Sequence, residues 1–340
     1  MPSCLKCGAA LAVNEEGVAP VLCDRCAGVA TGRARRTMAI GGLGGYQVTA
    51  LLLAINILAF LVDMVSGHNL SLWGANIGPY TLSGQYWRLF TAGFLHADII
   101  HIAFNMWCLW SLGRLSERLF GKWQTFAIYM VTGVGGALLS IAYKPERAEL
   151  GASGAIFGLV GAVLAGVKFG DFNISTGEKR AIASSVVTFA VINFMLGMSG
   201  NIDNMCHFGG FVTGLLIGLP MGAFARRNKI LQVFTLLITS AVLAAGAREL
   251  VQTHGAGAQK DLAIRAAQHG DPAGAAYLLE YIRNNPEDEE ALTSLGYYYV
   301  RTNQPRKAID SFQRVLKFNP GSQEAKQALD GLGADAADKK

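Results

Sequence analysis

Residues 151–169 read GASGAIFGLVGAVLAGVKF, and residues 204–224 read NMCHFGGFVTGLLIGLPMGAF. Both segments repeat a small residue at every fourth position: Gly154, Gly158 and Ala162 in the first, and Gly210, Gly214 and Gly218 in the second. This spacing puts the small residues on one face of a helix, where they allow two membrane helices to cross closely. The two segments therefore predict a tightly packed pair of membrane helices.

These two segments belong to a series of seven apolar runs. The runs cover residues 48–65, 98–113, 123–143, 153–169, 181–200, 204–224 and 230–248. Most of them approach the roughly 20 residues that a membrane-spanning helix needs. The chain has 340 residues, of which 51% are apolar and 16% are charged, and this balance does not suit an ordinary soluble domain. We therefore expect an all-α polytopic membrane protein.

Basic residues gather at one end of the predicted helices. The clusters precede the first and fifth runs and follow the second and sixth: Arg33–Arg36, Lys179–Arg180, Arg114–Lys122 and Arg226–Lys229. Because cytoplasmic loops carry an excess of Lys and Arg, we expect a cytoplasmic N-terminus and an extracytoplasmic C-terminus. The clusters lie between apolar runs rather than on one folded face, so no nucleic-acid-binding surface is predicted.

The first thirty residues carry two pairs of cysteines. Cys4 and Cys7 form one C-x2-C motif, and Cys23 and Cys26 form the other. This spacing is typical of a structural zinc site with four thiolate ligands, so residues 1–30 are expected to form a zinc ribbon, with 31–47 as a linker. Two disulfides, or unpaired cysteines in a disordered tail, are the alternatives. A reducing cytoplasmic location favours zinc.

Residues 255–333 are polar and show a helical pattern. Their apolar and turn residues fall at the offsets of a tetratricopeptide repeat: Leu292, Leu295, Gly296, Tyr299, Ala308, Phe312 and Pro320. A less regular copy lies 34 residues upstream, and an unrelated helical hairpin is the alternative. Such repeats present a concave surface to protein partners. The final residues, 334–340, are expected to be a disordered tail.

Four polar side chains fall inside the predicted membrane helices. His101 and Asn105 begin the second run, Ser153 begins the fourth, and His207 lies near the start of the sixth. These runs enter the membrane from the same side, so the four residues share one depth. A polar or ionisable group at that depth marks a functional site by default, because burying it alone costs free energy.

The chemistry that suits these residue types is acyl transfer. A serine hydroxyl is a weak nucleophile until a base such as His207 takes its proton. His101, Asn105 and the backbone N–H groups at Ser153 would stabilise an oxyanion. No acidic residue is expected at this depth, so the hypothesis is a Ser–His dyad that needs no cofactor. The alternatives are a packing role for Ser153, an interhelical hydrogen bond for His207 and helix association through Asn105.

Further motifs surround these residues. They are Trp87-Arg88, Glu117-Arg118, Gly151-Ala152-Ser153-Gly154, and His207 followed by Gly210-x3-Gly214. In this order and spacing, residues 48–224 resemble the rhomboid family of intramembrane serine proteases. The resemblance implies a six-helix core with Ser153 and His207 as the catalytic dyad. It implies an oxyanion hole made by His101, Asn105 and the Ser153 amide.

The resemblance implies supporting roles for other residues. Trp87 and Arg88 would stabilise the loop after the first helix, and Glu117 with Arg118 would brace the inner end of the second. One departure is Phe157, because many relatives have a tyrosine there, packed on the catalytic histidine. Residues 225–250 would add a seventh transmembrane helix.

The expected function is cleavage of single-pass or polytopic membrane proteins within the lipid bilayer. The architecture suggests a bacterial plasma membrane. The ribbon and the repeat domain would recruit protein partners. The alternative is a catalytically inactive rhomboid-like scaffold that binds membrane helices and partner proteins. The intact pair of Ser153 and His207 favours the protease.

Overall fold

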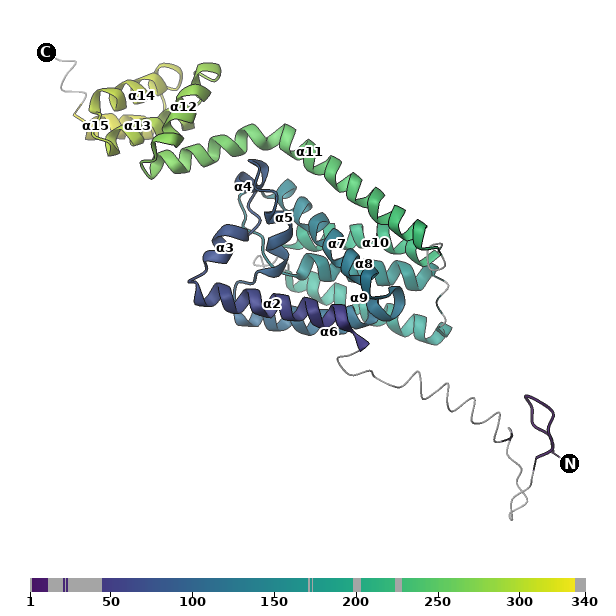
Figure 1. The fold of residues 1–340 in the computed structure, drawn as a ribbon. Helices are drawn as coiled ribbons and strands as arrows, with labels where there is room; N and C mark the ends of the chain where they lie inside the picture. The colour runs from purple at the N-terminus through teal and green to yellow at the C-terminus, as the bar shows by residue number, and fades with distance from the viewer. Residues whose placement is uncertain are drawn as a thin grey trace. The chain divides into compact units, whose positions relative to one another are not determined.

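A computed structural model describes residues 2–11, 21, 23, 45–170, 172, 174–197, 203–223 and 228–333. It forms two compact units, Met1–Gln47 and Val48–Lys340. Every regular element among the described residues is a helix, which confirms the predicted all-α class (Figure 1). Cys26, most of the predicted linker 31–47 and the predicted tail 334–340 lie outside the described residues.

Each of the seven apolar runs falls mainly on a helix, as far as its residues are described. These are α2 (Gln47–Val65), α6 (Ile99–Phe120), α7 (Lys122–Tyr143), α8 (Ser153–Phe169), α9 (Thr176–Gly197), α10 (Asn204–Ala223) and α11 (Lys229–Gln268). Among the described helices, α2, α7, α10 and α11 are long and apolar enough to cross a membrane. The pair Arg88–Phe94 and α6, bent by 93°, would make a fifth span, and α8 is a shorter apolar helix. The full set of seven spans stays a prediction.

Two helices run further than the sequence predicted. Arg114 and Arg118 lie on α6 instead of in a connecting loop, since the helix continues to Phe120 and ends where Gly121 adopts a φ of 101°. The seventh apolar run continues without a break into the polar segment, so that α11 has 40 residues. No proline interrupts that stretch, and its glycines weaken a helix without ending it.

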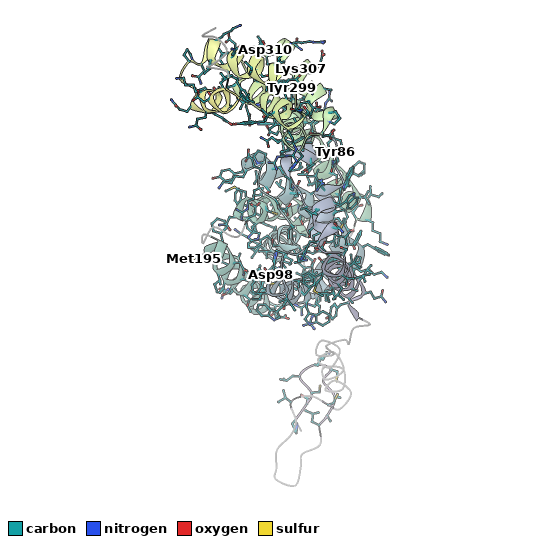
Figure 2. The ribbon with its side chains drawn as sticks, turned by 90° about the vertical axis from the view of Figure 1, so that its left-hand side faces the viewer. Tyr86, Asp98, Met195, Tyr299, Lys307 and Asp310 are labelled. Atoms are coloured by element: carbon teal, nitrogen blue, oxygen red, sulfur yellow. The ribbon has the colours of Figure 1, made fainter. Side chains whose placement is uncertain are left out.

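Aspartate caps fix where two of the site-bearing helices begin. The Asp98 carboxylate (labelled in Figure 2) accepts hydrogen bonds from the backbone N–H groups of Ile100 and His101, at 2.9 and 2.8 Å. Asp203 accepts from the N–H groups of Met205 and Cys206, both at 3.0 Å. Such caps satisfy N–H groups that lack a partner within the helix. They therefore fix where the helical turns that carry His101 and His207 begin.

Helix α8 is the centre of the bundle, because thirteen of its 17 residues are buried. The two stripes of small residues meet where α8 crosses α10. A methyl group at Gly210 would collide with the carbonyl oxygen of Gly154, and one at Gly214 would collide with that of Gly158. The backbones of the two helices are therefore in direct contact.

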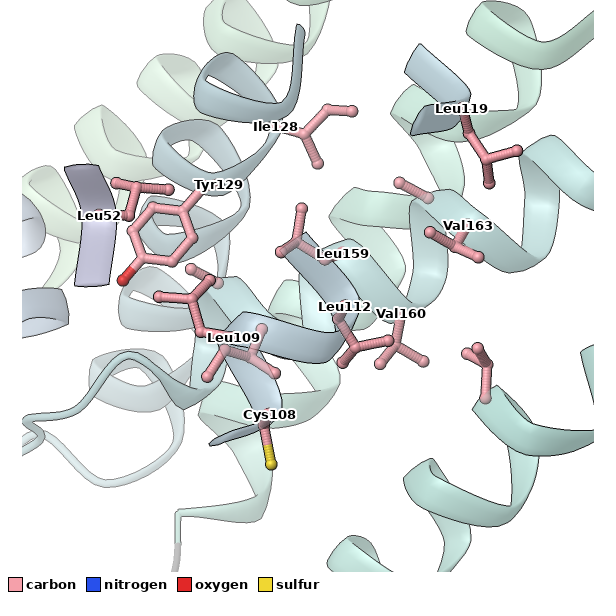
Figure 3. Packing of buried hydrophobic residues seen from close by; sticks show 14 of the residues in the cluster. Leu52, Cys108, Leu109, Leu112, Leu119, Ile128, Tyr129, Leu159, Val160 and Val163 are labelled. Atoms are coloured by element: carbon pink, nitrogen blue, oxygen red, sulfur yellow. The ribbon is translucent and has the colours of Figure 1, made fainter. Parts of the chain in front are cut away.

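Helices α6, α7 and α9 also pack against α8, and larger side chains extend the apolar core to α2. Figure 3 shows Tyr129 of α7 beside Leu52 of α2, with Leu109 of α6 next to them. The Tyr129 hydroxyl donates to the backbone oxygen of Gly93 at 3.3 Å. This contact joins the core to the segment that precedes α6.

That segment contains the short helices α3 (Asn69–Gly74), α4 (Gly78–Leu82), α5 (Arg88–Thr91) and η2 (Ala92–Phe94). Arg88 is buried, and its guanidinium donates to the carbonyl oxygens of Leu72 and Ala75 at 3.2 and 2.7 Å. The Trp87 ring stacks on Trp73 with 5.7 Å between centroids. Both side chains hold distant parts of the segment together.

Glu117 lies near the other end of the bundle. Its carboxylate accepts hydrogen bonds from both the backbone N–H and the hydroxyl of Thr49, which ties the end of α6 to the start of α2. The neighbouring Arg118 is exposed.

The C-terminal part of the chain is a stack of short helices. They are α12 (Pro272–Asn284), α13 (Glu289–Arg301), α14 (Pro305–Phe318) and α15 (Gln323–Gly331). Leu292, Leu295 and Phe312 are buried in a separate apolar cluster, and Gly296 leaves room for the Phe312 ring. The apolar pattern thus marks the buried face, while the assignment to tetratricopeptide repeats stays a prediction.

The crossing of α8 and α10 yields a stability prediction. Gly214→Val should lower the free energy of unfolding by about 1–3 kcal/mol, because the added side chain meets backbone atoms that cannot move aside. Thermal unfolding of the detergent-purified protein measures the change. Gly246→Val is the matched control, since a Cβ at Gly246 has nothing within 4 Å. Equal unfolding temperatures for both variants would contradict the close crossing.

Candidate active site

One small cavity gathers the four polar residues that the sequence singled out. Ser153, His207, His101 and Asn105 all line a space of about 80 Å³. Its walls come from α6, α8, α9 and α10, and the other lining residues are Phe104, Cys108, Ile156, Phe157, Phe189 and Asn193. Residues that are far apart in the chain thus share a single recess in the bundle.

The loop before Ser153 depends on a glycine. Gly151 has a φ of 132°, and its N–H donates to the carbonyl oxygen of Ala92 at 2.9 Å. A Cβ at this position would lie 2.9 Å from His101 Nε2 and 3.9 Å from Ser153 Oγ. A side chain at Gly151 is therefore disfavoured both by the positive φ and by the lack of space. The His101 imidazole and the Ser153 hydroxyl both lie close to this point of the loop.

Packing orients the His207 ring. The imidazole stacks on Phe157 with 4.2 Å between the ring centroids and 11° between the planes, and His207 is only 4% exposed. Its Nδ1 has no hydrogen-bond partner within the described part of the chain. The phenylalanine thus supplies the aromatic contact without a hydroxyl group.

Asn105 and His101 lie one turn apart on α6. The Asn105 side-chain amide donates to the His101 carbonyl oxygen at 3.1 Å, which leaves its own oxygen and second N–H for other partners. His96 packs edge-on against His101 at 5.0 Å and is 1% exposed. His96 does not line the cavity, so it contributes to the site only through the position of His101.

The expectation that no acidic residue lies at this depth is wrong. Asp203 caps α10 and accepts a hydrogen bond from the Ser140 hydroxyl at 2.5 Å. Glu149 is 5% exposed and accepts from the Asn76 side-chain amide at 3.1 Å and from the Cys206 thiol at 3.5 Å. Neither carboxylate is hydrogen-bonded to His207.

Sequence reasoning missed these carboxylates for different reasons. Asp203 directly precedes an apolar run, which is the signal of a helix cap and was available. Glu149 sits in a loop with several charges, and its burial results from pairing with a distant segment: backbone hydrogen bonds link it to Asn76 in both directions, at 2.9 and 2.8 Å. No local pattern marks that pairing.

Comparison with known proteins points to one family. Residues 83–224 match the rhomboid domain. The matches support the rhomboid family. The rhomboid-matched region contains all four cavity residues named above, whereas residues 1–47, α2, α11 and the C-terminal helices α12 to α15 lie outside it. Together with the apolar helices, the match supports an integral membrane protein.

Curated relatives carry the same family name. The chain is 32% identical to "Rhomboid protease GluP" of Bacillus subtilis (strain 168), over 75% of this chain and 58% of that protein. It is 31% identical to "RHOMBOID-like protein 4" of Arabidopsis thaliana, over 52% of this chain and 48% of that protein. It is 26% identical to "Rhomboid protease AarA" of Providencia stuartii, over 59% of this chain and 82% of that protein. The chain therefore spans about half the length of the first two relatives.

The N-terminal unit brings three of the predicted metal ligands together. The sulfur atoms of Cys4, Cys7 and Cys23 all lie within 4.8 Å of one another, with 3.6 Å between those of Cys7 and Cys23. Two thiolates at 2.3 Å from one tetrahedral zinc ion are about 3.8 Å apart, so the spacing fits. Backbone hydrogen bonds, led by that from Cys23, lower the pKa of the Cys4 thiol to about 6, which favours the thiolate. These residues fit a structural zinc ion.

Glu149 makes the stability of the fold depend on pH. Burial raises the pKa of this loop carboxyl from 4.5 to about 7; the Asn76 hydrogen bond opposes that shift and the charge of Asp203 adds to it. Because the folded protein holds the proton more tightly than the unfolded chain, the contribution is complete below pH 4.5 and is lost as the pH rises through 7. Wild type should therefore unfold at a lower temperature at pH 8 than at pH 5.

The Glu149→Gln variant isolates this contribution, because glutamine keeps the shape and cannot titrate. Its unfolding temperature should change less between pH 5 and pH 8 than that of wild type. Glu146→Gln changes an exposed carboxylate in the same loop and is the control, with the pH dependence of wild type. The same pH dependence in all three proteins would rule out a protonated Glu149 in the folded state.

Proposed function

We propose that this protein is an intramembrane serine endopeptidase in which Ser153 is the nucleophile and His207 is the base. The observation that carries the proposal is the shared cavity, because a nucleophile, a base and two amide or imidazole groups converge on about 80 Å³ of space. The rhomboid match and the relatives named as proteases support the reaction type.

The residues suggest the following steps. His207 takes the proton from Ser153 Oγ as the oxygen attacks the scissile carbonyl carbon, and then gives that proton to the leaving amine. His101, Asn105 and the backbone N–H of Ser153 donate hydrogen bonds to the oxyanion of the tetrahedral intermediate. A water molecule then hydrolyses the acyl-enzyme with His207 again acting as base. None of these steps requires a metal ion or a cofactor.

The site also suggests which substrates fit. The cavity is small, so residues with small side chains suit the position at the cut. Next to it lies an apolar recess of about 270 Å³ between α9 and α10, which shares Phe157 and His207 with the cavity and includes Met195 (labelled in Figure 2). We propose that an apolar transmembrane segment of a single-pass or polytopic membrane protein enters there.

The appended units extend the proposal. The ribbon in residues 1–30 would hold a structural zinc ion through Cys4, Cys7, Cys23 and Cys26 and would lie in the cytoplasm. The helical unit in residues 255–333 would lie on the opposite side of a bacterial plasma membrane and bind proteins as tetratricopeptide repeats do. Both units would recruit substrates or partners.

Metal content tests the ribbon. Purified full-length protein should contain about one zinc ion per chain by plasma mass spectrometry, and Cys4→Ser should lose most of it, because a missing thiolate leaves an incomplete tetrahedral site. Cys108→Ser is the control, since Cys108 lies buried in α6 and is not one of the predicted zinc ligands. Equal zinc content in all three proteins, or no zinc in wild type, would refute a metal site in the ribbon.

Variants of the dyad test the protease. Wild type in liposomes should cleave a model single-pass substrate within its transmembrane segment, and Ser153→Ala or His207→Ala should reduce the rate to background, a loss of several orders of magnitude. A fluorophosphonate probe should label wild type and fail to label Ser153→Ala. Ser111→Ala is the matched control, because the Ser111 hydroxyl is exposed and bonds only its own helix, through the Trp107 carbonyl oxygen.

Two results would oppose the proposal. Cleavage that survives in Ser153→Ala would assign the activity to another residue. A wild type that neither cleaves several substrates nor reacts with the probe, while still binding membrane helices, would favour the scaffold.

A further inference from the structure

A second cavity lies apart from the candidate active site. It has a volume of about 610 Å³ and is formed by α7, α11 and the segment around α5. Its lining is almost entirely apolar: Tyr86, Leu89, Phe90, Met130, Val131, Val134, Leu138, Ser240, Leu243, Ala244, Ala247, Arg248, Val251 and Gln252. None of these residues belongs to the dyad or the oxyanion hole, so the proposed reaction leaves this cavity unexplained.

The shape of the cavity follows two helix faces. On α7 the lining residues include Met130, Val134 and Leu138, and on α11 they include Ser240, Ala244 and Arg248, so that both walls repeat every fourth position. Between Ser240 and Arg248 the α11 wall rises about 12 Å. The cavity is therefore an elongated groove that runs along the helices.

One end of the groove carries a cation. Arg248 lies nineteen residues after Lys229, the start of α11, and this corresponds to a rise of about 28 Å. That distance matches the roughly 30 Å of hydrocarbon in a bilayer, so Arg248 is expected at the level of the lipid phosphates. Arg248 is exposed, and within the described residues no carboxylate lies at ion-pair distance from it.

The surroundings of Arg248 suit a lipid headgroup. The next residue, Glu249, is displaced by about 100° around the helix and does not line the groove. Tyr86 (labelled in Figure 2) and Gln252 also line the groove and offer polar groups, and tyrosine favours the membrane interface. Below them, the walls offer only contacts suited to hydrocarbon, apart from Ser240.

We propose that this groove binds an anionic phospholipid, with an acyl chain between α7 and α11 and the phosphate on Arg248. Charge and polarity determine this choice. Arg248 stands at one end of a groove whose walls are otherwise almost entirely apolar, and an anionic headgroup with a hydrocarbon chain has the complementary pattern. Lipid is also the solvent that surrounds these faces. The inference does not depend on the proposed protease activity.

Lipid retention by the full-length protein tests the proposal. The protein is purified in detergent, mixed with equal amounts of phosphatidylglycerol and phosphatidylcholine, and analysed by native mass spectrometry. Wild type should retain one phosphatidylglycerol. Ala244→Trp should abolish the retention, because the added ring fills the groove. Arg248→Gln should weaken the preference for phosphatidylglycerol roughly fivefold, as expected for the loss of one cation near an anionic headgroup.

Two matched variants separate these effects from general damage. Ala245→Trp places the same ring on the neighbouring exposed position, which does not line the groove, and should retain the lipid. Arg265→Gln removes the same charge further along α11 and should keep the preference. Equal retention by Ala244→Trp and Ala245→Trp would overturn the site. An unchanged preference in Arg248→Gln would overturn the choice of an anionic headgroup.

Discussion

The direct backbone contact between α8 and α10 is the constraint on which the rest of the structure depends. Gly154 and Gly158 on one helix face Gly210 and Gly214 on the other, and no position tolerates even a methyl group. Helix α7 joins this arrangement, because Thr213 occupies the space beside Gly135 and Thr132 the space beside Gly158. In lipid, where no hydrophobic force drives helices together, this close packing is a main source of association.

The geometry of the candidate site depends on the contact between α8 and α10. Ser153 immediately precedes Gly154, and His207 lies one turn before Gly210, so the hydroxyl and the imidazole stand at the end of the crossing. Any side chain that separated the helices would also separate these two groups. Gly136 of α7 has a similar role, because a Cβ there would collide with the carbonyl oxygen of Cys206, the neighbour of His207. Packing and the proposed chemistry therefore rest on the same small residues.

The features that sequence predicts well here are periodic and local. The small-residue stripes and the buried positions Leu292, Leu295 and Phe312 follow from spacing along a helix. Sequence also suggested that Ser153, His207, His101 and Asn105 share one depth, because depth follows from position along each helix. Their roles in catalysis remain proposals.

The sequence does not predict features that depend on contacts between loops. Glu149 lies 73 residues from Asn76, and only the folded chain brings them together to bury a carboxylate. The hydrogen bonds of Arg88 to two carbonyl oxygens belong to the same class, since the motif suggested a structural role without naming the partners. The extent of α11 was misjudged because polarity changes along it while helical conformation does not.

The way His207 is held explains why a third catalytic residue is unnecessary in the proposed dyad. In a Ser–His–Asp triad the carboxylate orients the imidazole, but a further buried charge inside the bilayer would add a desolvation cost. Here Asp203 acts on the backbone: it caps α10, and its carbonyl oxygen accepts the His207 N–H at 3.2 Å. Phe157 then fixes the plane of the ring, and an aromatic pair of this kind contributes about 0.5–1.5 kcal/mol without any charge. The start of α10 determines the position of His207, and the stacked Phe157 ring determines the orientation of its imidazole. Neither effect requires a charged group beside the dyad.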